Sequence, residues 1–231
     1  MMKKKCLIVT GGSIDLSFVK DFLQNRRYDL VVAVDAGLKV LKHLHMIPDE
    51  VVGDLDSVDP AVLEEYRNMP GIRFEIHKPE KDETDTELAL LTAARCGCEA
   101  VDLIGALGGR MDHAISNIQL MYQFYQQGMD ICIYDSRNKM YLLGKRKVFH
   151  QKELYGNYIS FLPLTETVEG LTLKGFKYPL NHRTIRLGTS LCISNELVEE
   201  EGRITLSDGV LITVESHDCL LYTSLPLNIA L

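Results

Sequence analysis

The sequence predicts an α/β domain with a mainly parallel sheet, followed by an antiparallel β-sandwich. Short apolar runs alternate with helical periodicity up to about residue 135, which is typical of strands joined by crossover helices. From about Asn138 this periodicity stops, and short β-branched and aromatic runs are separated by Gly, Asn and Asp, which favours antiparallel strands. We therefore expect domains at residues 1–138 and 139–231.

The elements of the first domain follow from these patterns. The apolar run at residues 5–10 ends in Gly11-Gly12, and residues 14–26 place Leu16, Val19 and Phe22 on one side of a helix. Further strands are expected at residues 30–34, 50–52, 73–77, 101–104 and 131–134. Further helices are expected at residues 38–46, 60–69, 86–96 and 111–127.

The second domain shows strand patterns at residues 158–162, 171–173, 184–187, 203–206 and 210–214. Asp208-Gly209 lies between the last two and is a strong hairpin signal. A two-residue loop there would place Leu206 opposite Leu211 and Ile212 opposite Thr205. The register of this expected hairpin is therefore open.

Composition limits the class of partner. The chain has 231 residues, a net charge of -7, a pI near 5.5 and 46% hydrophobic residues. These values support packed cores and argue against a nucleic-acid binder with a broad basic face. A small anionic ligand remains compatible, because one basic residue and backbone donors can hold it.

The N-terminus and the cysteines predict a cytoplasmic protein without a membrane partner. The apolar run after Met1–Lys5 is too short for a signal peptide, and no stretch approaches the roughly 18 to 20 apolar residues of a membrane span. The cysteines are best explained as reduced thiols. They are Cys6, Cys96, Cys98, Cys132, Cys192 and Cys219.

Four polar stretches follow strand candidates, at residues 34–37, 53–57, 81–87 and 108–113. The carboxyl ends of parallel strands meet at one edge of the sheet, where ligands bind. Carboxylates gathered there repel one another unless a cation lies among them. A nucleotide held by Mg²⁺ would satisfy the whole pattern, so we expect an enzyme of phosphate chemistry.

Asp54 and Asp56 are the first candidate metal ligands. In an extended segment they would point to the same side, and Mg²⁺ takes one or two carboxylates together with phosphates and water. The alternative is a turn before an N-cap, with Asp59-Pro60 starting the next helix. The neighbouring acidic stretches favour the metal.

The stretch from Lys81 to Glu87 opens a helix. Thr84 and Glu87 have the spacing of a capping box. Capping does not require Lys81, Asp82 or Asp85, so we expect Asp82 or Asp85 to reach a shared metal and Lys81 to meet a phosphate.

The stretch from Gly105 to Arg110 joins a strand to a helix. Gly108 and Gly109 allow close backbone approach to an anion, and Arg110 offers a planar fork suited to phosphate. The spacing matches neither standard glycine-rich nucleotide motif.

Three further side chains, Asp112, His113 and Asp35, have either a ligand-binding or a structural role. Asp112 and His113 begin the following helix, where His113 is either a ligand contact or a solvated cap. Asp35, before Ala36-Gly37, accepts from a ribose or base or else forms a turn.

Taken together, the motifs resemble those of thiamine pyrophosphokinases. They are Gly53-Asp-Leu-Asp-Ser57, Asp82-x-Thr84-Asp85, Gly108-Gly-Arg-x-Asp-His113 and Ser194-Asn-Glu196. The resemblance runs from Gly11-Gly12 to the Ser-Asn-Glu segment. It implies a nucleotide-binding α/β domain, a β-sandwich that binds thiamine and dimerises, and transfer of pyrophosphate from ATP to the thiamine hydroxyl, giving AMP.

The resemblance also implies roles for residues. Ser194 and Asn195 would contact thiamine across a homodimer interface. Separately, the chemistry of the transfer suggests that an aspartate not fully engaged by metal, Asp82 or Asp56, takes the hydroxyl proton. By the resemblance, Mg²⁺ would be held by Asp54, Asp56 and Asp85, and ATP by Asp35, Lys81, Arg110 and Asp112. From the residues themselves, we also expect Gly108, Gly109 and His113 to contact ATP. The expected catalytic group is Asp54, Asp56, Asp82, Asp85 and Arg110. Some family members cover the thiamine ring with a tryptophan; this chain has none, so a Tyr or Phe would stack instead.

Three other functions compete with this interpretation. A pyrophosphokinase for a hydroxymethyl pterin would use the same first domain but a different pocket in the second. A metal-dependent phosphatase usually needs an Asp directly after its first strand, where this chain has Gly11-Gly12. A nucleotide-binding sensor without catalysis would not need the metal aspartates.

Overall fold

The computed structural model describes residues 3–78 and 80–218. The chain divides into two compact units. The first runs to Ser136 and includes Met140–Leu142, and the second comprises Arg137–Lys139 and the chain from Leu143 onward. The division thus falls within strand β7 (Asn138–Leu143).

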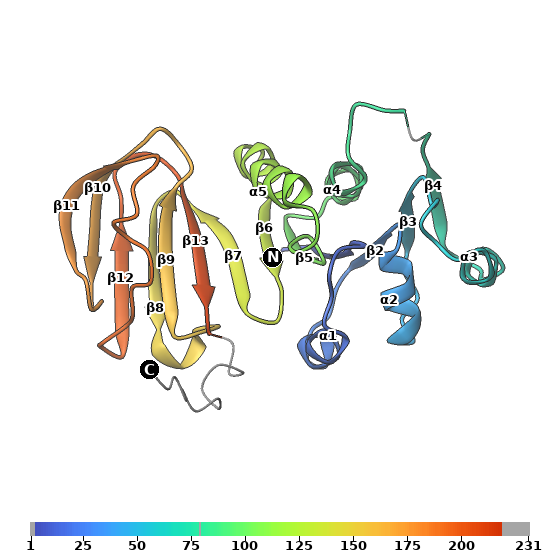
Figure 1. Ribbon diagram of the computed structural model, residues 1–231, viewed down its shortest axis with the longest axis horizontal. Coiled ribbons are helices and arrows are strands. Elements are labelled where there is room, and N and C mark those ends of the chain that lie inside the picture. Colours follow the sequence, from blue (N-terminus) through green and yellow to red (C-terminus); the bar gives the residue numbers. More distant parts are fainter. Residues whose placement is uncertain (1–2, 79, 219–231) are drawn as a thin grey trace, which may run out of the picture. The chain divides into compact units, whose positions relative to one another are not determined.

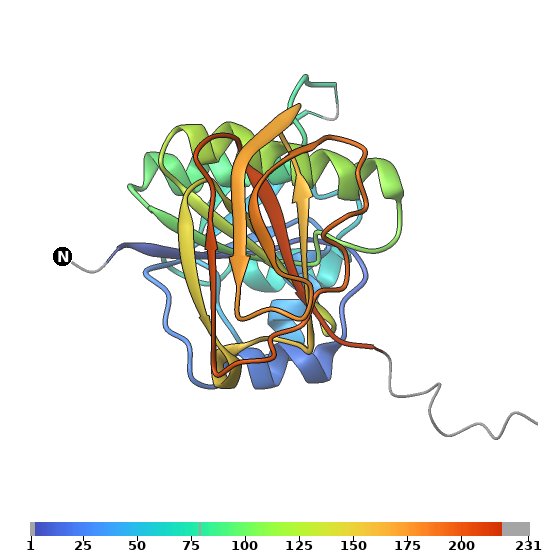
Figure 2. The same cartoon turned by 90° about the vertical axis from the view of Figure 1, so that its left-hand side faces the viewer.

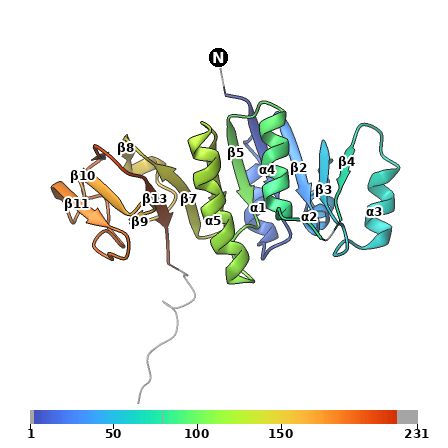
Figure 3. The same ribbon diagram turned by 90° about the horizontal axis from the view of Figure 1, so that it is seen from above.

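The first unit contains a parallel sheet of strand order β4-β3-β2-β1-β5-β6, part of which is seen from above in Figure 3. Every pair in this series is parallel. The strands are β1 (Lys5–Val9), β2 (Leu30–Val34), β3 (Glu50–Gly53), β4 (Arg73–Ile76), β5 (Ala100–Ile104) and β6 (Asp130–Tyr134). Their carboxyl ends therefore share one edge of the sheet.

Helices cover both faces of this sheet, with α1 and α2 on one face and α4 and α5 on the other (Figures 1 and 2). Ile8, Val32 and Leu103 are buried in the sheet, and Ala93 of α4 and Phe124 of α5 belong to the same core. This explains why the central strands β1 and β2 are almost wholly apolar. The helices are α1 (Leu16–Leu23), α2 (Gly37–His43), α3 (Pro60–Arg67), α4 (Asp85–Arg95) and α5 (Met111–Gln126).

Local caps fix where several helices begin. Asp15 caps α1 by accepting from the backbone of Ser17 and Phe18, and Asp59 caps α3 with Pro60 in its first turn. Thr84 Oγ1 accepts from the Glu87 backbone at 3.2 Å, so the predicted cap of α4 is confirmed.

The second unit is a β-sandwich. One layer contains the antiparallel pair β9–β13, and the other has the order β11-β10-β12-β8. The rings of Phe149, Phe161 and Phe176 pack with centroids 5.7 to 6.0 Å apart in its core. The predicted fold class is confirmed. The elements are β8 (Arg146–His150), η1 (Gln151–Glu153), β9 (Tyr158–Pro163), β10 (Thr167–Lys174), β11 (Leu180–Arg186), β12 (Glu201–Thr205) and β13 (Leu211–Ser216).

The predicted hairpin at Asp208-Gly209 is wrong. β12 pairs with β10 and β8, whereas β13 pairs with β9, so the turn carries the chain from one layer to the other. Gly209 has φ 92°, and a Cβ there would lie 2.5 Å from the Thr167 carbonyl oxygen. Glycine is needed for this close approach between strands, not for a two-residue loop.

None of the helices in the described ranges combines the length and apolar character needed to cross a membrane.

Candidate active site

A cavity of about 900 Å³ opens at the carboxyl edge of the first unit's sheet. Its walls come from the turns after β1, β2, β3 and β5 and from the first turns of α4 and α5. The predicted residues that line it are Asp35, Asp54, Asp56, Asp85, Gly108, Gly109, Arg110 and His113. Lys81, Asp82 and Asp112 are not among the lining residues.

Four of the lining residues are aspartates, Asp35, Asp54, Asp56 and Asp85, and together they form what we call the acidic wall of the cavity. Asp35 directly follows β2. Its backbone is left-handed, with φ 45°, and its Oδ1 accepts from the Leu55 backbone at 3.2 Å. A Cβ on Gly53 would lie 1.9 Å from this oxygen, so glycine is required beside it. Burial, followed by the neighbouring charges of Asp85 and Asp54, raises the pKa of Asp35 to about 7.

Asp54 and Asp56 lie in a turn. The prediction of an extended segment is wrong, because Leu55 has φ 62° and Asp54 Oδ1 accepts from the Asp56 backbone at 3.2 Å. Both residues nevertheless line the cavity. The turn brings them there because β3 ends at Gly53.

At the start of α4, Lys81 Nζ lies 2.6 Å from Asp85 Oδ1. The lysine thus neutralises a carboxylate of the cavity, whereas we expected it to face a phosphate. Asp82 is exposed. Of the two aspartates proposed for this helix start, the fold places Asp85 in the cavity.

The acidic wall suits Mg²⁺ by ligand type. Its carboxylates come from three separate segments, and burial together with the charges of Asp85 and Asp54 raises the pKa of Asp35. Hard oxygen ligands of this kind are those that Mg²⁺ takes. Within the described ranges, no three His, Cys, Asp or Glu side chains are grouped closely enough to form a complete metal site.

The β5–α5 connection forms the opposite wall. Gly105, Gly108 and Gly109 have φ values of 80°, 85° and 75°, which favour glycine. Arg110 donates from Nε to Asp112 Oδ1 at 3.1 Å and from its terminal nitrogen to Oδ2 at 2.5 Å. These bonds lower the pKa of Asp112 to about 2.

The sequence analysis missed several lining residues. Ser13 follows the Gly11-Gly12 turn, and their place directly after the first strand was an available signal. Asn117 lies four residues after His113 on α5, so helical spacing would have put both on one face. Thr10, Ser57, Thr84 and Thr86 also line the cavity.

Ser194 and Asn195 belong to the second unit and differ in their surroundings. Ser194 is exposed, has φ 52° and donates its backbone N–H to Ser160 Oγ at 3.0 Å. Asn195 is only 1% exposed. Its Oδ1 accepts from the backbones of Tyr178 and Glu196 at 3.0 and 2.9 Å, and its Nδ2 donates to the Tyr178 carbonyl at 2.9 Å.

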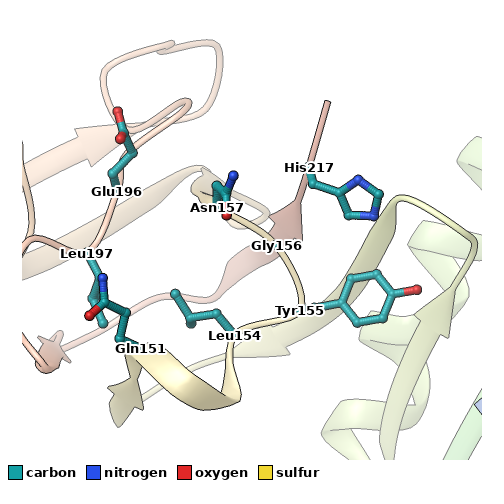
Figure 4. A pocket seen from close by; sticks show the side chains of 8 residues that line it. All are labelled: Gln151, Leu154, Tyr155, Gly156, Asn157, Glu196, Leu197 and His217. Carbon is teal, nitrogen blue, oxygen red and sulfur yellow. The ribbon is translucent and has the colours of Figure 1, made fainter. Parts of the chain in front are cut away.

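A second cavity, of about 420 Å³, lies beside this segment in the second unit. In Figure 4 the rings of Tyr155 and His217 lie on one side of it and Glu196 on the other. The two ring centroids are 6.4 Å apart, and Glu196 pairs with Lys177 at 2.6 Å. The cavity thus combines aromatic, amide and carboxylate groups.

Comparison with known proteins identifies the family. Residues 22–133 match the model of the thiamin pyrophosphokinase catalytic domain, and residues 146–211 match that of its vitamin B1 binding domain. A thiamine pyrophosphokinase from Bacillus subtilis is 37% identical over 91% of this chain and 98% of its own length. The chain belongs to the thiamine pyrophosphokinase family.

Solved structures of the family share the fold over nearly the whole chain. The Bacillus subtilis thiamine pyrophosphokinase superposes with a TM-score of 0.83 and 33% identity, covering 94% of this chain and 100% of that one. Thiamin pyrophosphokinase from Geobacillus thermodenitrificans superposes with a TM-score of 0.79 and 31% identity, covering 94% of this chain and 99% of that one.

Proposed function

We propose that the protein transfers the pyrophosphoryl group of ATP to the hydroxyl of thiamine, giving thiamine diphosphate and AMP. The observation that carries this is the first-unit cavity. It joins Asp54 and Asp56 to the Gly108-Gly109-Arg110 loop, in a chain that matches both domains of the thiamine pyrophosphokinase family. Acidic and basic walls facing one another suit a metal–polyphosphate substrate.

For the metal, we propose Mg²⁺ held by Asp54, Asp56 and Asp85. Bound there, Mg²⁺ would neutralise phosphate oxygens and the charge that develops on the leaving AMP. Asp85 is paired with Lys81. If Asp85 exchanged this lysine for the metal, the Lys81 ammonium group would become available to the nucleotide. Asp35 completes the acidic wall.

For the nucleotide, the opposite wall supplies the binding groups. Backbone amides of Gly108 and Gly109 would approach the phosphates, and Arg110 would exchange Asp112 for a phosphate oxygen. His113 lines the cavity one turn into α5 and would contact the same ligand. Asp112, which lies outside the lining, would act by holding Arg110 until the nucleotide arrives.

The transfer itself needs little covalent chemistry from the protein. The thiamine hydroxyl oxygen forms a bond to the β-phosphorus, the bond from that phosphorus to the oxygen bridging to the α-phosphate breaks, and AMP leaves with that oxygen. The hydroxyl proton would pass to a carboxylate. Asp56 is the better candidate for this base, through the oxygen that the metal leaves free, because it lines the cavity and Asp82 does not.

For thiamine, we propose the segment at Ser194 in the second unit. The domain model for vitamin B1 binding covers it. The exposed Ser194 can contact a ligand directly, whereas the buried Asn195 would shape the segment through its bonds to Tyr178 and Glu196. The neighbouring cavity in Figure 4 offers a carboxylate and a tyrosine ring suited to a cationic ring.

A homodimer is also part of the proposal, with the thiamine segment of one chain serving the site of its partner. Exposed apolar side chains immediately before this segment support it: Leu187, Leu191 and Ile193 are 63%, 51% and 41% exposed. Clustered exposed apolar residues mark interaction surfaces. We also expect a cytoplasmic protein, in keeping with the reduced thiols predicted from the sequence.

The experiment that tests the function is an assay of the purified protein with Mg²⁺, ATP and thiamine, followed by chromatography of nucleotides and thiamine species. We expect AMP and thiamine diphosphate to form in equal amounts. Formation of ADP with thiamine monophosphate would contradict pyrophosphoryl transfer. AMP release only with a hydroxymethyl pterin would show that the acceptor substrate is a pterin alcohol and not thiamine.

A further inference from the structure

The crevice between β1 and β5 is the switch point of the first unit's sheet. Strands β2, β3 and β4 follow one another on one side of β1, and the later strands β5 and β6 lie on its other side. Ligands of open α/β sheets bind in the crevice at such a point. Here it is flanked by two turns that both line the 900 Å³ cavity, residues 11–13 after β1 and residues 105–109 after β5.

The two turns pack against each other. A Cβ on Gly12 would lie 2.0 Å from the Gly105 carbonyl oxygen, and one on Gly108 would lie 3.0 Å from Ser13 Cβ. The Thr10 backbone N–H also donates to the Ile104 carbonyl at 2.9 Å. The conformation of the β5 turn therefore depends on the β1 turn beside it.

Asn117 holds the β5 turn from a second direction. Its Nδ2 donates to the Ala106 carbonyl at 2.9 Å, and the two residues are 6% and 4% exposed. The bond fixes the peptide plane two residues before Gly108. Water has little access to replace it, so loss of this donor would leave a buried carbonyl without its partner and free the turn to reorient.

Charge is divided between the two sides of the cavity. Its lining carboxylates, Asp35, Asp54, Asp56 and Asp85, all follow β2 or β3 or begin α4. The lining residues on the β1 and β5 side include Arg110 and His113 but no carboxylate. An anionic chain is therefore repelled by one wall and accepted by backbone amides and a guanidinium at the other.

We propose that Asn117 is a positioning residue for the nucleotide's polyphosphate: it keeps the turn at residues 105–109 in the conformation that receives the phosphates opposite Ser13. This rests on the proposed nucleotide substrate but does not depend on thiamine. Asn117 acts through the Ala106 carbonyl, so its loss changes how phosphates are held more than how the nucleoside is held.

Asn117→Leu tests this, because leucine has similar size and no donor. Gln119→Leu is the matched control, since it removes an amide from an exposed position of the same helix. Asn117→Gln restores a donor at the original site. Calorimetric titration with inorganic triphosphate and, separately, with AMP measures phosphate and nucleoside recognition, and steady-state kinetics give KM for ATP and for thiamine.

We expect Asn117→Leu to weaken triphosphate binding and raise KM for ATP roughly tenfold, as for a lost buried hydrogen bond. AMP affinity and KM for thiamine should stay near the wild-type values, because the remaining contacts are intact. Asn117→Gln should recover part of the triphosphate affinity, and Gln119→Leu should match the wild type. A merely structural role would lower the melting temperature without separating triphosphate from AMP.

Ser13→Asp provides a test that does not disturb a buried bond, since Ser13 is exposed. Its carboxylate would face the proposed phosphate path, so triphosphate affinity should fall, whereas the uncharged Ser13→Asn should retain most of it. Unchanged triphosphate affinity in Ser13→Asp, or equal losses of triphosphate and AMP in Asn117→Leu, would overturn the proposal. Failure of the thiamine proposal would look different. The protein would then not turn over thiamine, but the variants would still differ in their affinity for triphosphate.

Discussion

The acidic wall of the first unit and the Ser-Asn-Glu segment of the second use their polar side chains in opposite ways. Burial, followed by the nearby charges of Asp85 and Asp54, raises the pKa of Asp35 to about 7. Asn195 is buried, and its carboxamide bonds to the backbones of Tyr178 and Glu196. The carboxylates therefore cost the fold some stability, and we propose that a cation offsets this cost, whereas the asparagine supports the fold.

The largest effect should come from Asp54→Asn. Removing one carboxylate from the proposed metal site should lower kcat/KM by about a hundredfold or more, comparable to the loss of one electrostatic group in other enzymes. The melting temperature without Mg²⁺ should hold or rise, because repulsion within the wall decreases. An activity assay and a thermal melt of the same preparation measure kcat/KM and the melting temperature.

Glu64→Gln is the matched control for Asp54→Asn, since it makes the same carboxylate-to-amide change at an exposed position on α3. It should leave both activity and melting unchanged. If Asp54→Asn retained near wild-type activity, the metal assignment would be wrong and the acidic wall would lose its functional explanation.

Asn195→Ala should show the reverse pattern, with stability as the main loss. Alanine would leave part-buried backbone groups of Tyr178 and Glu196 without the partners that Asn195 supplies, so the free energy of unfolding should fall by about 2 to 4 kcal/mol. Denaturant unfolding measures this loss. Asn157→Ala, at an exposed position of the same unit, should change stability little.

A loss of thiamine affinity in Asn195→Ala without any loss of stability would break the comparison. It would mean that the side chain leaves its backbone partners to bind the ligand. The segment would then resemble the acidic wall, whose carboxylates we propose bind a ligand.

The smallest effect concerns pH and Asp35. Its folded-state pKa of about 7 lies above the value of 3.8 expected for a free aspartate, so the folded protein binds this proton more tightly than the unfolded chain does. The resulting stabilisation is fully present below about pH 4 and is lost as pH rises through about 7. Asp35→Asn cannot titrate and should retain the Leu55 hydrogen bond through Oδ1.

Thermal melts from pH 5 to 8, without Mg²⁺ or nucleotide, test this difference. The wild type should lose more stability than Asp35→Asn over this range, and the variant should be the more stable at pH 8. Parallel curves for the two proteins would show that burial and the nearby carboxylates do not raise the pKa of Asp35 in the folded protein.

Parts of the site were predictable because they depend on local sequence. A strand followed at once by Gly11-Gly12, by Asp35 or by Gly53-Asp54 must present those residues at the carboxyl edge once the strands are parallel. Gly53 was harder to explain from sequence. Only the structure shows that a Cβ there would collide with the Asp35 carboxylate.

Other parts depended on contacts between distant segments. The choice of Asp85 over Asp82 for the cavity follows from where α4 begins, and the bond between Asn117 and Ala106 follows from how α5 packs beside β5. The internal bonds of Asn195 require Tyr178 to lie beside it. Such non-local pairs leave no periodic signal in a single sequence.

By itself, the sequence determined the alternation of strands and helices, the change to antiparallel strands near Asn138, and the gathering of acidic turns at one sheet edge. Hydrophobic periodicity and turn residues act over a few positions, so one chain suffices to read them. Only the tertiary structure decided which layer β13 joins, which carboxylates share the cavity and which polar side chains remain inside the fold. Those outcomes depend on strand pairing and packing between residues far apart in the chain.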